Sequence, residues 1–212
     1  MTLQYLLTIA NSSGGILYFM LILLFVAIVI IVERLKHLSD MRRVGNELIT
    51  MCQRKGTIKL DSLQSLQKNH DDYPIIQLLN IVINTNIKDL NRETLEGNLE
   101  EEIMLEVPHL DKNVWVLDTI ITLAPLLGLF GTIVGMFNAM AFITDIQNSA
   151  MQISGGISEA LISTAFGLVI AMVGLSFYNN INQKIRLLVH QMETFKVMVL
   201  NRAEEFKNIN PL

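Results

Sequence analysis

The chain has 212 residues, of which 51% are hydrophobic and 17% are charged, less than the quarter that is usual for a soluble domain. Its formal net charge is −4 and its basic residues are not interleaved with aromatic ones, so no nucleic-acid partner is expected. Cys52 is the only cysteine, which excludes an intrachain disulfide and a zinc site built from several thiolates. The apolar residues gather in long blocks, which predicts an all-α membrane protein embedded in a lipid bilayer.

Three of these blocks are long enough to cross a membrane. A helix of about 20 residues, rising about 1.5 Å per residue, spans roughly 30 Å of hydrocarbon. Each block is expected to be helical, because lipid leaves an isolated span no other way to satisfy its backbone. The predicted transmembrane helices are residues 15–33, 119–143 and 157–178.

Basic residues indicate the orientation of the spans. All sixteen Lys and Arg residues fall in two stretches, eleven from Arg34 to Lys112 and five from Lys184 to Lys207. The positive-inside rule therefore places the loop 34–118 and the C-terminal segment 179–212 in the cytoplasm. The two remaining connections are expected on the periplasmic side, which gives the alternation that three spans require: residues 1–14 and 144–156.

The cytoplasmic segments are predicted to be long helical extensions. After the third span, apolar residues recur at the spacing of one helical face: Ile185, Leu188, Val189, Met192, Phe195 and Val199. We expect this face to be buried against the chain's own loop helices and against neighbouring copies. The four histidines are scattered and the acidic run from Glu100 to Glu106 is typical of a solvated helix face, so no enzyme, metal or cofactor site is predicted.

Glu159 is the acidic residue that lies within a predicted span, and no further charge follows it until Lys184. A charged side chain in a span costs about 2.5–3.5 kcal/mol, so it usually faces protein or a wet cavity and marks an ion route. A second interpretation is that Glu159 stands in the first turn of its span, after Gly155 and Gly156, where the helix N-terminus and the interface favour a carboxylate. The residue by itself leaves both interpretations open.

Small residues form a stripe along the second and the third span. Such stripes let helix backbones approach closely, and their simplest interpretation is a packing surface. The residues predicted to pack in this way are Gly128, Gly131, Gly135, Ala160, Gly167 and Ala171. Thr132 and Thr164 add hydroxyl groups that can bond across helices, back to a carbonyl, or to waters in a lumen. If the Glu159 carboxyl loads and releases a proton, the two threonines beside it predict an ion relay.

Two stretches carry a family resemblance: LAPLLGLFGTIVGMFNAM from Leu123 and GGISEALISTAFGLVIA from Gly155. They resemble the second and third spans of the MotA/TolQ/ExbB proton channel family, and their residues are most similar to those of ExbB. The three-span layout with a long cytoplasmic loop is similar as well, whereas MotA has four spans. The likeness therefore favours the ExbB and TolQ branches.

The resemblance implies a homopentameric ring in the bacterial inner membrane. The ring is expected to enclose the single spans of an ExbD-type dimer and to use the proton motive force for work on TonB, which drives uptake across the outer membrane. By motif position, the resemblance makes Glu159 the pore-lining glutamate and makes Thr132 and Thr164 the threonines of the proton pathway. The proton-binding aspartate is expected on the ExbD-type partner. Two alternatives are a TolQ-like subunit for outer-membrane integrity and a passive membrane scaffold that recruits partners.

Overall fold

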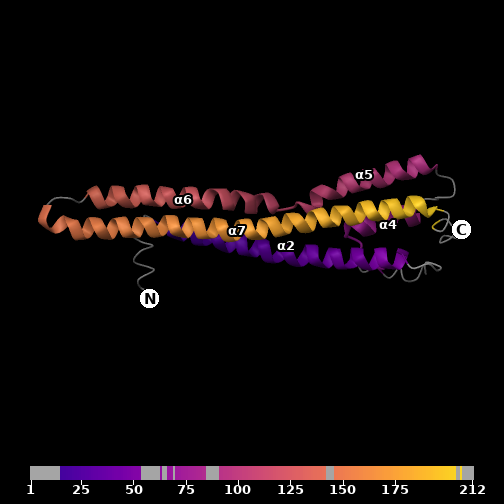
Figure 1. Ribbon diagram of the computed structural model, residues 1–212, viewed down its shortest axis with the longest axis horizontal. Helices are drawn as coiled ribbons and strands as arrows, with labels where there is room; N and C mark the ends of the chain where they lie inside the picture. Colours follow the sequence, from indigo (N-terminus) through magenta and orange to yellow (C-terminus); the bar gives the residue numbers. More distant parts are fainter. Residues whose placement is uncertain are drawn as a thin grey trace. The chain divides into compact units, whose positions relative to one another are not determined.

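A computed structural model describes residues 15–53, 63, 66–68, 70–84, 91–141, 146–203 and 206, with the side chains of residues 84, 141, 146–153 and 159 left out of the description. This part of the chain is helical and contains no strand, so the predicted all-α fold is confirmed. Its main helices, labelled as in Figure 1, are α2 (Ile16–Gln53), α4 (Pro74–Asn84), α5 (Arg92–Leu110), α6 (Val114–Ala141) and α7 (Ile146–Asn201).

Among the described helices, α2, α6 and α7 are long and apolar enough to cross a membrane. The longest, α7, has 56 residues and at about 1.5 Å per residue extends about 84 Å, well beyond the roughly 30 Å hydrocarbon core. The prediction of three transmembrane helices with long helical extensions is therefore confirmed.

Two helices extend beyond the predicted membrane spans at their N-terminal ends. Helix α6 begins at Val114 rather than at 119, and α7 begins at Ile146, so most of the stretch 144–156 is helical. Helix α7 continues through Gly156. The residue packs closely against α6, since a methyl group there would lie 2.6 Å from the Cβ of Ala139.

The chain divides into two units, each described here by itself. One, called the membrane unit, comprises Met1–Glu33 and Asn113–Asn180, and the other, called the charged unit, comprises Arg34–Lys112 and Ile181–Leu212. All sixteen Lys and Arg residues belong to the charged unit. Charge and tertiary contacts therefore divide the chain at the same places.

In the membrane unit, α6 runs beside α7 (Figure 1) at a separation that glycine makes possible. A methyl group at Gly167 would lie 2.4 Å from the carbonyl oxygen of Ala124, and one at Gly128 would lie 2.9 Å from that of Ser163. Met20 of α2 reaches the same seam, with its Cε 3.2 Å from the methyl position at Gly167. The three helices therefore share one close-packed contact.

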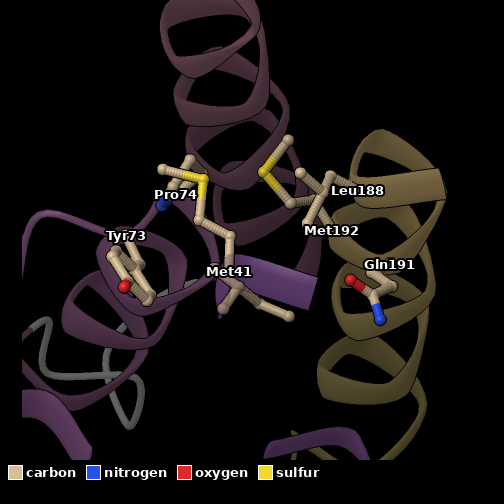
Figure 2. A pocket seen from close by; sticks show the side chains of 7 residues that line it. Met41, Tyr73, Pro74, Leu188, Gln191 and Met192 are labelled. Carbon is tan, nitrogen blue, oxygen red and sulfur yellow. The ribbon is translucent and has the colours of Figure 1, made fainter. Parts of the chain in front are cut away.

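The charged unit has an apolar core of its own. The predicted face of α7 is buried at Ile185, Leu188, Met192, Phe195 and Val199, and half-buried at Val189. Figure 2 shows Leu188 and Met192 together with side chains from α2 and from the start of α4. The expectation that this face packs against the chain's own loop helices is confirmed.

A buried glutamine interrupts this apolar core. The Nε2 of Gln191 donates to the Oδ1 of Asn46 at 2.6 Å and to the carbonyl oxygen of Arg42 at 3.4 Å. Its Oε1 has no hydrogen-bond partner and occupies the space above Gly45, where a methyl group would be 2.8 Å away. Beside Gln191 lies a cavity of about 10 Å³ (Figure 2), about the volume that one water occupies. The Gln191 amide reaches Asn46 and the Arg42 carbonyl only when α2 and α7 have this position along each other. These hydrogen bonds therefore specify how the two helices are aligned.

Two glycines of α7 provide a matched test of the close packing. We expect Gly167→Ala to destabilise the membrane unit, because the rigid backbone of Ala124 leaves no room for a methyl group. Gly155→Ala should be neutral or slightly stabilising, because nothing lies within 4 Å of its methyl position and alanine favours the helix by up to about 1 kcal/mol. Thermal unfolding in detergent measures both variants, and equal stability of the two would contradict the packing account.

Glu106 of α5 makes the stability of the charged unit depend on pH. Burial raises the pKa of the Glu106 carboxyl above its ordinary value of 4.5, His109 opposes this shift, and Glu102 adds to it. The folded state therefore favours the protonated form, and this contribution is complete below the unfolded-state pKa and lost as pH rises through the folded-state pKa. We expect Glu106→Gln to remove this loss of stability with rising pH. The measurement is the unfolding temperature as a function of pH, from pH 4.5 upward. The exposed Glu101 supplies the control, because Glu101→Gln should retain the slope.

Candidate functional site

Glu159 lies well inside α7. The helix begins at Ile146, so Glu159 is more than three turns beyond the helix N-terminus rather than in its first turn. The influence of a helix terminus on a charge falls off within the first turn. The helix N-terminus therefore does not favour a carboxylate at position 159, and the side chain of Glu159 lies outside the described part of the chain.

The residue after Glu159 marks its depth in the membrane unit. Ala160 is buried, and its Cβ would lie 2.9 Å from a methyl group placed at Gly135 of α6. Glu159 is therefore at the level of the last glycine of the α6 stripe. One turn further along α7, Ser163 lies against Gly131 and Gly128, so the two helices remain in contact below this level.

Of the six small residues predicted to pack, five are buried and Ala171 is half-buried. The five buried ones lie on the facing sides of α6 and α7, where methyl groups at Gly128 and Gly167 would meet backbone atoms of the other helix. Close backbone contact is how such residues stabilise helix pairs in lipid, where no hydrophobic effect drives association. The stripe thus joins the helices that carry the two predicted threonines.

Thr164 and Thr132 use their hydroxyl groups differently. The Oγ1 of Thr164 donates to the carbonyl oxygen of Gly128 across the helix pair at 3.0 Å. The Oγ1 of Thr132 donates to the carbonyl of Leu129 in its own helix at 2.7 Å. Each oxygen retains lone pairs that can accept a hydrogen bond from water or from a protonated carboxyl. The structure brings Thr164 to the α6–α7 seam, and leaves Thr132 partly exposed beside it.

Ser163 is a polar residue of the seam between α6 and α7. Its side chain is fully buried and its Oγ, 3.4 Å from the methyl position at Gly131, has no hydrogen-bond partner. A buried hydroxyl without a partner costs roughly 1–3 kcal/mol. The available signal was its position between Ala160 and Gly167 at helical spacing, which indicates burial but not whether a partner is present.

The membrane unit holds few charged groups. It contains no Lys or Arg, and Asp118 of α6 is exposed within the unit. Among the described residues, no group of three or more His, Cys, Asp or Glu side chains could hold a metal ion.

Comparison with known proteins identifies the family. Residues 65–194, more than half of the chain, match the MotA/TolQ/ExbB proton channel family, and the chain belongs to this family. An ExbB-like biopolymer transport protein of Synechocystis sp. is 44% identical over 84 residues, which are 38% of this chain and 40% of that relative. An ExbB homologue of Methanothermobacter thermautotrophicus is 25% identical over 190 residues, 89% of this chain and 67% of the relative.

Relatives of the second branch match as well. The Tol-Pal system protein TolQ of Haemophilus influenzae is 31% identical over 91 residues, which are 42% of this chain and 40% of that protein. The chain thus aligns with about two fifths of the length of this TolQ and of the Synechocystis relative. Together with the three apolar helices, these matches define a multi-span membrane protein of a proton-channel and transport family.

Neighbouring hydroxyl groups of α7 give opposite expectations for stability. Thr164→Val removes the bond to Gly128 and should cost about 0.6 kcal/mol, with about 1.7 kcal/mol as the upper bound for such bonds in membranes. Thr164→Ser should retain most of the stabilisation that this hydrogen bond provides. Ser163→Ala should be neutral or stabilising, because it removes an unpaired buried hydroxyl. Unfolding of the purified protein by titration with denaturing detergent compares the three variants, and a loss in Ser163→Ala equal to that in Thr164→Val would contradict the hydrogen-bond assignment.

Proposed function

We propose that the chain is the proton-channel subunit of an ExbB–ExbD type motor in the bacterial inner membrane. Copies of the chain form a ring, with five copies as the family resemblance implies, around the single spans of an ExbD-type partner. The complex uses the proton motive force for work on a TonB-type protein. The N-terminus is periplasmic and the C-terminus cytoplasmic, as the distribution of Lys and Arg favours.

The single observation that carries this proposal is the position of Glu159. It is a carboxyl group in the interior of a long apolar helix, next to the glycine-packed seam between α6 and α7. Lipid penalises a charge within a membrane span, so the carboxyl is expected to face the inside of an assembly. Membership of a proton channel family supplies the ion that such a group would exchange.

The proton motive force is sufficient for mechanical work. Each charge that crosses the membrane releases about 2.3 kcal/mol per 100 mV. Glu159 accepts a proton from the partner's acidic residue or from water and releases it to the other side, while Thr132 and Thr164 accept hydrogen bonds along the route. Stepwise motion of the partner inside the ring couples this transfer to force on the TonB-type protein.

A TolQ-like role is the second candidate, because TolQ proteins match the chain at an identity similar to that of ExbB proteins. The proton chemistry is the same in both roles, and only the protein on which the work is done differs. In the TolQ-like role, the motor would maintain the outer membrane instead of driving uptake through it.

Replacement of the Glu159 carboxyl tests the function directly. We expect Glu159→Gln to leave membrane insertion and assembly intact and to abolish work that depends on the proton motive force, because an amide cannot load and release a proton. Glu159→Asp should retain part of the activity. The measurement is uptake of a TonB-dependent substrate in cells that contain the full complex, with sensitivity to detergents as a parallel readout of outer-membrane integrity.

Glu101→Gln is the matched control, because Glu101 is an exposed carboxylate of the charged unit and should tolerate the same change. Loss of uptake alone supports the ExbB-type role, and loss of detergent resistance alone supports the TolQ-type role. Normal uptake and normal detergent resistance in Glu159→Gln would leave the passive scaffold as the better description.

A further inference from the structure

Helix α6 has three faces within the membrane unit. One is buried against α7 and α2 and includes Ala124 and the glycines. The second is exposed and made of bulky apolar side chains, as is typical of contact with lipid: Leu123, Leu126, Phe130, Ile133, Phe137 and Met140. The third face follows from a turn of about 100° per residue, because positions 118, 122, 125, 129, 132 and 136 lie above one another on the helix.

This third face carries three polar side chains of α6. Asp118 and Thr122 are exposed, Thr132 is partly exposed, and Leu129 and Met136 lie between and beyond them. Pro125 lies on the same face, and because proline has no N–H, the carbonyl of Ile121 lacks its usual helical donor. A face with a carboxylate, two hydroxyls and a carbonyl that has lost its usual helical donor is costly in contact with lipid.

Asp118 and Thr132 stand far apart along α6. From Asp118 to Thr132 the helix rises about 21 Å, since fourteen residues contribute about 1.5 Å each, which is most of the roughly 30 Å hydrocarbon core. Thr132 is at the upper end, within one turn of Gly135, which packs against Ala160 beside Glu159. Asp118 is at the opposite end, close to the start of α6 and to the boundary with the charged unit.

We propose that Asp118 and Thr122 form the cytoplasmic end of the proton route that begins at Glu159 and Thr132. This inference rests on the proposed function and adds the residues through which protons leave. The Asp118 carboxylate takes the proton from a hydronium ion of the route, which becomes water, and then releases that proton to cytoplasmic water, so that no other atom is transferred. Thr122 donates to the carbonyls of Asp118 and Thr119 within its own helix, and its lone pairs accept a hydrogen bond from the same water.

Thr119 and Thr122 lie at nearly the same level of α6 but on different faces of the helix. Its Oγ1 donates to the carbonyl of Trp115 at 2.9 Å, as Thr122 bonds to Asp118 at 3.1 Å, and both side chains are exposed. Thr119 nevertheless stands at the head of the face formed by Leu123 and Leu126. The two threonines therefore form a matched pair, one on the polar face and one on the apolar face.

Proton influx into liposomes tests the inference, with the full chain assembled with its single-span partner and a pH-sensitive dye inside. We expect Asp118→Asn to lower the influx at least about tenfold, as loss of a positioned proton-transfer group does, and Asp118→Glu to restore most of it. Thr122→Val should lower the influx about threefold to tenfold, an effect on water ordering that Thr122→Ser avoids. Thr119→Val should leave the influx unchanged.

The outcomes separate this inference from the function on which it rests. Normal influx in Asp118→Asn together with no influx in Glu159→Gln overturns the exit while the proposed function stands. Normal influx in both variants overturns both. Equal losses in Thr119→Val and Thr122→Val overturn the assignment of the face. If Asp118→Asn does not assemble, the comparison of Thr122→Val with Thr119→Val decides, because neither change alters charge or volume greatly.

Discussion

The close approach of α6 and α7 is the constraint on which the membrane unit depends. Lipid provides no hydrophobic drive between helices, so their association requires backbone contact and hydrogen bonds. Gly167 supplies the first, because it lies where any side chain would strike the carbonyl of Ala124. Thr164 supplies the second through its bond to Gly128, which forms only at this separation. A larger residue in the seam would therefore remove both contributions together.

The same packing determines which polar groups are available for function. The seam takes up one face of α6, and the bulky side chains from Leu123 to Met140 form another. Asp118, Thr122 and Thr132 are left on a face that neither packs against α7 nor suits lipid. An assembly that keeps this face wet would account for the polar groups and for the depth of Glu159 with one arrangement. The proposed route therefore depends on helix packing as much as on the acidic residues.

The charged unit is stabilised in a different way. Its apolar core is supplemented by single polar contacts between distant segments, among them Gln191 with Asn46, Lys196 with Glu100, and Arg202 with the carbonyl of Cys52. Burial raises the pKa of Cys52 to about 11, against the opposing charge of Arg202, so its thiol stays protonated and unreactive at neutral pH. These contacts join α2, α5 and α7 outside the apolar spans, where water makes a conventional core possible.

The sequence by itself determined the three apolar helices, the division of charge at Arg34 and Lys112, and the buried face from Ile185 to Val199, because hydropathy and helical periodicity depend only on residue type and spacing. It also indicated the small-residue stripes. Only the tertiary structure decided that α7 continues through Gly155 and Gly156, that Thr164 bonds to Gly128, and that the hydroxyl of Ser163 has no partner. Whether a glycine ends a helix or admits a neighbour, and whether a hydroxyl finds an acceptor, depends on the other helix, which local sequence does not specify.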